Sequence, residues 1–529
     1  ALRRSAYSSI IWDMYDYACG LLLPNGDMIA QAETIPAQLG IMPTAVQHIL
    51  EEIPLSEWND GDVIVCNDPY RGCTHTMDIV LFSPVYFEGE IIAIASTIAH
   101  HIDIGGKVPG TEASDSVELF EEGLVLPPLK LLEGGEPNKA IFAIIKTNVR
   151  DPRASLGDLR AQIAGCRTGE NRLRDLCKRH GKTRFHALAE ACLDYTQTFI
   201  QSALNDVGEA TNTACVLIED DVSTDEPIRI QVAIAIRDGR LNIDFTGTSD
   251  QRDNALNCPA SSTISMVHYA VKAVFAPGLP QNEGCNRPID ISVPEGCLLA
   301  PKHPAAVSVR HLTQQAVADS VIKALAPLAM ATVSAGAHVS FPTFCAGGVD
   351  DRRPADQSQP YYVISDIVGG GMGGFQGGDG MNAIDTHGGN CATLSAEIME
   401  QMSPFRILRA ELIPDSGGAG AFRGGLGIRR DYQLLASSSI VSGYLQQSRP
   451  ETLPWGFVGG GDGGPSAAVL NPGTNHEKPL SSKWVSLRMQ TGDVLRLDGA
   501  GGGGWGNPAE RAADKVEHDL REGYVTAEA

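Results

Sequence analysis

Three histidines and two aspartates near residues 75 and 100 form the pattern with the clearest chemical potential in this sequence. His75 and Asp78 are three residues apart, and His100 lies 25 residues after His75. Two imidazoles and one carboxylate suit Zn, Mn or Fe, and they leave a position open for water or substrate. His101 and Asp103 follow and could orient a ligand or accept a proton. The pattern predicts a site for one divalent metal ion.

Two strands are expected to bring these residues together. The apolar runs 79–86 and 91–98 predict buried strands, and Glu88-Gly89-Glu90 predicts the turn between them. Because a hairpin returns the chain to the end where it began, His100 should lie beside His75. The alternative is that these polar residues are ordinary strand-end caps and surface groups.

The patterns elsewhere predict a mixed, multi-lobed α+β fold. Helical spacing of apolar residues favours helices over 261–275 and 312–330, and a short amphipathic helix is expected within 509–523. The expected regions are a mixed α/β metal-site region (1–135), a helical block (136–212), an α+β middle region (213–345) and a glycine-rich, β-rich C-terminal region (346–529).

The composition is that of a globular protein. Hydrophobic residues make up 43% of the 529 residues, and 41 basic against 64 acidic residues give a net charge of −23, which disfavours nucleic acid and anionic membranes as partners. No apolar run reaches the roughly 18 residues of a membrane span. The twelve cysteines include no C-x-x-C pair. A reducing, cytoplasmic location is therefore expected.

Glycine is concentrated in the last third of the chain. The clusters lie at 369–374, 417–420, 459–464 and 501–504, and none has the Gly-x-x-x-x-Gly-Lys-Ser/Thr form of a phosphate-binding loop. Tight turns and close backbone packing are therefore favoured over a nucleotide site. Cys73 lies close to His75, but a packed thiol is favoured over a nucleophile at this position.

Several long motifs follow one another along the chain. They are Asn67-Asp68-Pro69-Tyr70, Thr74-His75 with Asp78, His100-His101-Ile102-Asp103-Ile104-Gly105-Gly106, Asn148-Val149-Arg150, Asp158-Leu159-Arg160-Ala161-Gln162, Asp244-Phe245-Thr246-Gly247-Thr248-Ser249, Asn282-Glu283-Gly284-Cys285, Pro414-Asp415-Ser416-Gly417-Gly418, Arg423-Gly424-Gly425 and Gly504-Trp505-Gly506. In this order they resemble the hydantoinase B/oxoprolinase family almost from end to end. That family includes the B subunits of N-methylhydantoinases, the caprolactamase β subunit, the C-terminal half of 5-oxoprolinase, and related subunits of acetone and acetophenone carboxylases.

The resemblance implies a set of metal ligands. In the family, a divalent ion is held by an early aspartate, the His-x-x-Asp pair and the first histidine after the hairpin. These positions fall on Asp16, His75, Asp78 and His100. Asp13 competes for the early position, where the motif context favours Asp16.

One stretch, from residue 33 to 40, departs from the family pattern. Many relatives carry histidines in this stretch, whereas this chain has Thr34 and Gln38. If these positions line the pocket, the substrate preference of this chain should differ from that of those relatives.

The resemblance also implies an activity. Amide resonance and ring reclosure oppose the hydrolysis of a small cyclic amide, and relatives couple ring opening to ATP. Because this chain lacks an ATP motif, a hydantoinase A-type ATP-binding subunit is expected to phosphorylate the amide within a hetero-oligomer. Metal-activated water would then attack the former carbonyl carbon, with His101 or Asp103 relaying the proton.

Two other functions stay open at this stage. The first is a subunit of an ATP-dependent ketone carboxylase, which needs the same metal and also a phosphorylated intermediate. The second is a non-catalytic scaffold that stabilises an ATPase partner. The site residues do not separate the hydrolase from the carboxylase.

Overall fold

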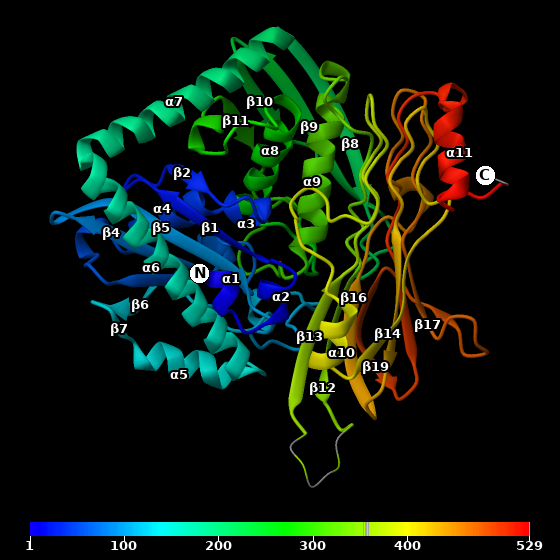
Figure 1. Ribbon diagram of the computed structural model, residues 1–529, viewed down its shortest axis with the longest axis horizontal. Helices are drawn as coiled ribbons and strands as arrows, with labels where there is room; N and C mark the ends of the chain where they lie inside the picture. Colours follow the sequence, from blue (N-terminus) through cyan, green and yellow to red (C-terminus); the bar gives the residue numbers. More distant parts are fainter. Residues whose placement is uncertain (353, 355–356, 358, 528–529) are drawn as a thin grey trace.

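The computed structural model describes residues 1–352, 354, 357 and 359–527. Its helices and strands form an α+β fold with four sheets, which confirms the expected fold class (Figure 1). The largest hydrophobic cluster extends from Leu2 to Leu497 and joins residues from most of the chain. Within the described residues, none of the helices has both the length and the hydropathy that a membrane crossing requires.

The first sheet positions the predicted metal ligands. Its strand order is β2-β1-β5-β4-β3-β6-β7, and β4 and β5 pair antiparallel with Asp78 opposite His100, as the predicted hairpin requires. A second hairpin, formed by β1 and β2, lies at one edge of this sheet. The strands are β1 (Tyr17–Leu22), β2 (Met28–Gln31), β3 (Val63–Cys66), β4 (Asp78–Phe87), β5 (Glu90–His100), β6 (Leu129–Glu133) and β7 (Glu136–Pro137).

Helices cover this sheet and extend beyond it. Asp151 caps α6 by accepting bonds from the amides of Arg153 and Ala154, and Gly181, at φ 82°, separates α6 from α7. The helix α6 packs on β4 and β5, and α7 extends to the second sheet (Figure 1). The N-terminal helices are α1 (Leu2–Ser5), α2 (Ser9–Trp12), α3 (Pro36–Leu39) and α4 (Met42–Glu52); the helical block contains α5 (Lys139–Asn148), α6 (Pro152–His180) and α7 (Lys182–Val207).

The middle region contains a four-stranded sheet and two buried helices. The sheet order is β11-β10-β9-β8, and α9 packs against β8 and β9. The prediction of a helix as far as residue 330 was too long, because α9 ends at Leu325 and Pro327, which lacks an amide hydrogen, lies in a 3-10 turn. The elements are β8 (Ala210–Ile218), β9 (Ile228–Arg237), β10 (Arg240–Asp244), β11 (Ile289–Ser292), α8 (Ala260–Phe275) and α9 (Arg310–Leu325).

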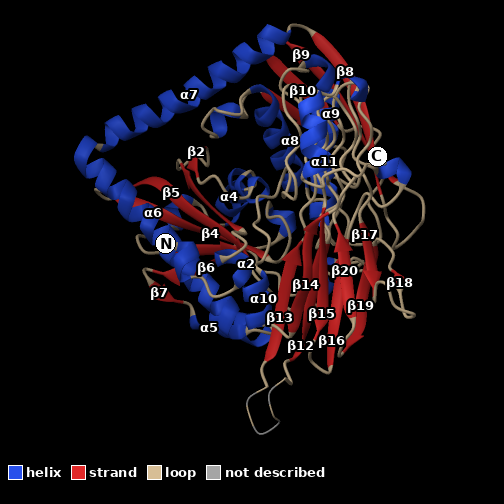
Figure 2. Cartoon of the chain, turned by 45° about the vertical axis from the view of Figure 1, so that its right-hand side comes forward, coloured by secondary structure: helices blue, strands red, loops and turns tan. Residues whose placement is uncertain are grey.

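The C-terminal region contains two further sheets, shown in Figure 2, with orders β13-β12-β16-β19 and β14-β15-β20-β17-β18. The terminal helix lies within the predicted range 509–523 and follows a separate 3-10 turn that begins at Pro508. The elements are β12 (Thr343–Val349), β13 (Tyr361–Ile367), β14 (Phe405–Leu412), β15 (Ile428–Leu434), β16 (Ser438–Tyr444), β17 (Ala467–Leu470), β18 (Lys478–Pro479), β19 (Lys483–Gln490), β20 (Val494–Asp498), α10 (Ala396–Met402) and α11 (Ala513–Arg521).

The glycine clusters pack against one another outside the regular strands. We call residues 369–374, 417–427, 459–464 and 499–504 the glycine bundle. Its segments form hydrogen bonds directly through their backbones. The amide of Gly502 donates to the carbonyl of Gly425 at 2.9 Å, and the amide of Gly418 donates to the carbonyl of Gly502 at 2.8 Å. A Cβ on Gly502 would lie 2.0 Å from the carbonyl oxygen of Met372. Close backbone packing, as predicted, explains these glycines.

Candidate metal centre

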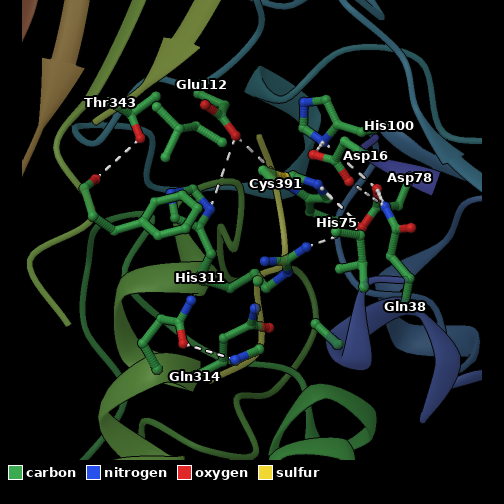
Figure 3. A pocket seen from close by; sticks show the side chains of 18 of the residues that line it. Asp16, Gln38, His75, Asp78, His100, Glu112, His311, Gln314, Thr343 and Cys391 are labelled. Carbon is green, nitrogen blue, oxygen red and sulfur yellow. Dashed lines mark hydrogen bonds and ion pairs between the residues drawn. The ribbon is translucent and has the colours of Figure 1, made fainter. Parts of the chain in front are cut away.

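A small buried pocket lies where the first sheet, α3, α9 and the C-terminal strands meet (Figure 3). It encloses about 50 Å³, room for a few water molecules. Its polar lining comprises Asp16, Gln38, His75, Asp78, His100, Glu112, Arg310, His311, Gln314, Gln315, Thr343, Ser365, Cys391 and Tyr444. Cys73 lies outside this lining as a buried thiol in a hydrophobic cluster.

The four residues predicted as ligands meet in this pocket. His75 Nε2 lies 3.4 Å from Asp78 Oδ2, and His100 Nδ1 lies 3.5 Å from Asp78 Oδ1 and 4.0 Å from Asp16 Oδ2. Candidate ligand atoms of His75, Asp78 and His100 all lie within 4.8 Å of one another. Ligands about 2 Å from one ion have such separations, so the residues fit a divalent metal.

Strand pairing also brings Asp16 to the site. The strand β1, which follows Asp16 directly, pairs with β5, and the amide of His100 donates to the carbonyl of Asp16 at 3.2 Å. The competing Asp13 points elsewhere: its Oδ2 accepts the amide and hydroxyl bonds of Ser395, the residue before α10. Geometry therefore favours Asp16 over Asp13 as the early ligand.

Hydrogen bonds fix the orientation of two candidate ligands. His75 Nδ1 donates to the carbonyl of Ser308 at 3.0 Å, which leaves Nε2 with the lone pair, and this buried Nε2 has no hydrogen-bond partner. Thr74 and Arg310 both donate to Asp78 Oδ2. Outer partners of this kind are typical of metal ligands. A metal ion would supply the partner that His75 Nε2 lacks.

Gln38 joins the two carboxylates of the site. Its Nε2 donates to Asp16 Oδ1 at 2.7 Å and to Asp78 Oδ1 at 2.9 Å, and its Oε1 is buried without a partner (Figure 3). Of the two positions at which this chain departs from the family pattern, Gln38 thus lines the pocket. Thr34 instead lines a neighbouring groove.

Burial and charge set the ionisation of the site. Burial opposes a charge on Asp78, but His75, His100 and Arg310 hold its pKa well below the usual range. Burial lowers the pKa of His75, with Arg310 adding to the effect. Burial also lowers the pKa of His100, yet the bond to Asp78 and the charge of Asp16 outweigh it and raise the pKa to about 9. Asp78 and His75 are therefore in the forms that bind a cation, whereas His100 has to release its proton when a metal ion binds.

The structure places His101 and Asp103 outside the lining of the pocket. His101 Nε2 lies 3.0 Å from Gln162 Oε1. The carboxylate of Asp103 accepts bonds from the Arg150 amide and guanidinium, both at 2.8 Å, and from the amides of Gly105 and Gly110. Asp103 therefore anchors the loop after the hairpin.

Glu112 and His311 were missed by the sequence reasoning. Glu112 Oε1 lies 3.9 Å from His311 Nδ1, and Glu112 Oε2 accepts the hydroxyl bond of Tyr444. His311 packs between the rings of Phe341 and Tyr444, at 5.0 and 4.8 Å between centroids. Neither residue has ligand-like spacing from the first group. The only signal was the adjacent pair Arg310-His311 at the start of a predicted helix.

Glu112 and His311 also form a possible ligand group with His75. The His75 nitrogen that lies 4.0 Å from Glu112 Oε1 is Nδ1, and it already donates to Ser308. The group with Asp78 and His100 instead uses the unpartnered Nε2. The second group is therefore the poorer metal site, and its residues are available for other roles at the pocket.

A family model described as hydantoinase B/oxoprolinase matches residues 1–508. A putative D-/L-hydantoinase B subunit from a Pseudomonas species is 33% identical, covering 100% of this chain and 90% of its own. The crystal structure of the ATP-dependent caprolactamase from Pseudomonas jessenii has a TM-score of 0.89 and 27% identity, over 97% of this chain and 89% of that chain. A nucleotide-free acetone carboxylase structure, 19% identical, shares the fold at a TM-score of 0.91, over 100% of this chain and 76% of that chain. The chain therefore belongs to the hydantoinase B/oxoprolinase family.

Proposed function

We propose that this chain is the metal-dependent subunit of an ATP-dependent cyclic amide hydrolase. The observation that carries the proposal is the convergence of Asp16, His75, Asp78 and His100 around an unpartnered His75 Nε2. The relatives named hydantoinase subunit and ATP-dependent caprolactamase support the reaction class. When bound, a divalent Zn, Mn or Fe ion would supply Lewis-acid activation of water or of the scissile amide.

The surrounding side chains orient these four ligands. Ser308 fixes the tautomer of His75, and Thr74 and Arg310 hold Asp78 by one oxygen. Arg310 Nε is buried, has no hydrogen-bond partner and belongs to a residue that lines the pocket. In the proposed reaction this group donates to an oxygen of the phosphorylated amide and holds it in the pocket.

Proton transfer belongs to groups that reach the pocket. His101 and Asp103 were predicted for this step, but the bonds of Asp103 to Arg150 and to the following loop occupy its carboxylate. Glu112 and His311 line the pocket, and we assign the proton transfer to them and the positioning of the hairpin loop to Asp103. His101, which contacts Gln162 behind the strand end, has a positioning role beside His100.

ATP enters the proposal through a partner. The proposed partner is a hydantoinase A-type ATP-binding subunit that phosphorylates a small cyclic amide, within a cytoplasmic hetero-oligomer. The word "subunit" in the names of the relatives supports a partner, and the absence of a phosphate-loop motif from this sequence supports ATP binding outside this chain.

The test combines metal analysis with turnover. The purified wild type should hold about one Zn, Mn or Fe ion per chain, and His75→Ala should hold almost none and lose at least about a hundredfold in ATP-dependent hydrolysis with the partner. His48→Ala, which alters a half-exposed histidine of α4, should match the wild type in both measurements. Hydantoin, 5-oxoproline and caprolactam are suitable substrates.

Three results would contradict the proposal. Full activity of a folded His75→Ala variant would remove the metal site from the mechanism. Labelled bicarbonate entering acid-stable product from a ketone would assign the chain to the carboxylases. Partner activity without this chain would leave it a scaffold.

A further inference from the structure

A second hollow, which we call the outer groove, lies on the other side of α3 from the metal pocket. It encloses about 640 Å³, within the range of about 300–1,000 Å³ found for small-molecule sites. Ala37 and Gln38 line the metal pocket, whereas Thr34, Pro36 and Leu39 line the outer groove. One short helix therefore separates the two spaces.

The helix α3 is held in place by its neighbours. Ser265 of α8 donates its hydroxyl hydrogen towards the carbonyls of Pro36 and Ala37, at 3.1 and 3.3 Å. The far wall of the outer groove is formed by α8 and by the loop over residues 277–286. The strand β2 also lines the groove, so its walls come from β2, α3, α8 and the 277–286 loop.

Four residues that line the outer groove each carry a buried polar atom that has no hydrogen-bond partner among the described residues. The atoms are Thr34 Oγ1, His268 Nδ1, Gln281 Oε1 and Glu283 Oε2. Leaving one such atom unpaired costs about 1–3 kcal/mol, so a cluster of them on one hollow points to a polar ligand.

The chemistry of these atoms limits the ligand. Gln281 Oε1 and Glu283 Oε2 accept hydrogen bonds but cannot donate them, and an ammonium group donates three. Burial raises the pKa of Glu283, so a cation beside it would relieve an unfavourable charge. Lys272 lines the same groove, and its ammonium group donates to the carbonyl of Pro277 at 3.1 Å, with two further hydrogens to offer.

We propose that the outer groove binds a zwitterionic amino acid, with the ammonium group at Glu283 and Gln281 and the carboxylate at Lys272. The choice of this ligand class rests on the proposed function. Opening a lactam breaks the ring C–N bond; the hydroxyl of water goes to the carbonyl carbon and its proton to the nitrogen, so one molecule then carries a carboxylate and an amine.

Calorimetric titration of the chain with its partner, without ATP, tests the groove. The probes are 4-aminobutanoate, 5-aminopentanoate and 6-aminohexanoate, with hexanoate and hexylamine lacking one charge each. At least one amino acid should bind saturably, and both single-charge probes should bind at least tenfold more weakly. Glu283→Gln and Lys272→Met should each weaken binding at least tenfold, whereas Glu226→Gln on an exposed loop should leave it unchanged.

Two outcomes would overturn the proposal. One is a titration in which no amino acid gives a binding signal, and the other is a folded Glu283→Gln variant whose affinity for the amino acid is unchanged. Melting temperatures establish that each variant is folded. Because His75 lies outside the groove, His75→Ala should bind the amino acid like the wild type. Amino-acid binding without any cyclic amide hydrolysis would therefore contradict the proposed function and leave the groove proposal standing.

Discussion

The metal pocket and the glycine bundle are both buried and both depend on irregular chain segments, yet they are built in opposite ways. In the pocket, side chains from distant parts of the sequence converge, and polar atoms such as His75 Nε2, Gln38 Oε1 and Arg310 Nε lack partners. In the bundle most residues are glycines, and amides such as those of Gly418 and Gly502 are bonded to carbonyls of neighbouring segments.

The difference separates scaffold from site. A backbone whose amides and carbonyls are satisfied has no bonding capacity left for a ligand, so the bundle is expected to provide rigidity. A buried side chain without a partner is costly, and a ligand can recover that cost. Unpaired buried groups on residues that line a pocket, and not glycine content, therefore mark the candidate site in this molecule.

The largest effect is expected when a substitution adds one methyl group to the glycine bundle. In Gly502→Ala the new Cβ would lie 2.0 Å from the carbonyl oxygen of Met372, so backbone segments must separate. We expect the free energy of unfolding to fall by more than about 4 kcal/mol, so that the variant is insoluble or unfolded. Gly461→Ala, in the same bundle, places its Cβ 3.5 Å from the nearest atom and should cost about 1 kcal/mol or less. Equal soluble yield and denaturation midpoints for both variants would refute the packing argument.

A smaller effect is expected behind the metal pocket, at Glu122. Its Oε1 accepts the amides of Val307 and Ser308, and burial raises its pKa from 4.5 to about 7. The folded state therefore binds the proton more tightly, so this contribution to stability is full below about pH 4.5 and is lost as the pH rises through 7. Between about pH 4.5 and 8, the free energy of unfolding of the wild type should fall by up to about 3 kcal/mol relative to that of Glu122→Gln.

Denaturant unfolding at about pH 5, 6, 7 and 8 checks this value. Groups common to both proteins cancel in the difference between wild type and variant. Parallel stability profiles for wild type and Glu122→Gln would show that the carboxyl titrates normally despite its burial.

The smallest expected effect sharpens the role of Gln38. In the metal-free protein, Gln38→Ala removes the side-chain amide that donates to both Asp16 and Asp78. This loss should lower the free energy of unfolding by about 2 kcal/mol. A bound ion would compensate the same carboxylates, so the loss should shrink when Zn or Mn is added. Melting temperatures with a chelator and with added ion give the comparison, and Gln47→Ala on the exposed side of α4 is the control. A loss that is equal in both conditions would place Gln38 outside the metal site.

Local patterns were sufficient for the hairpin of the first sheet and for the candidate ligands His75, Asp78 and His100, whereas Asp16 came from the family resemblance. Alternating apolar runs and one turn fixed the β4–β5 hairpin, and the register that follows brings His100 opposite Asp78. Helical periodicity likewise predicted the block that became α5 to α7. These features depend on residues near one another in the sequence.

Long-range contacts explain what was missed. Glu112 and His311 meet at the pocket because a loop and the start of α9 fold onto the same strand ends, and no spacing in the sequence encodes that contact. The mutual bonding of the glycine segments is also long-range, as between Gly418 and Gly502. The pattern predicted tight packing there but could not name the partners.

The glycine bundle also divides the chain into parts with unequal freedom to evolve. At glycines such as Gly371 and Gly424, a carbonyl oxygen lies where a Cβ would be, so no other amino acid fits. Substitutions at these positions should therefore not be tolerated in evolution. The walls of the outer groove carry no such restriction, because they are formed by side chains such as those of Gln281 and Lys272. New substrate preferences can therefore arise by substitution in the groove while the bundle stays unchanged.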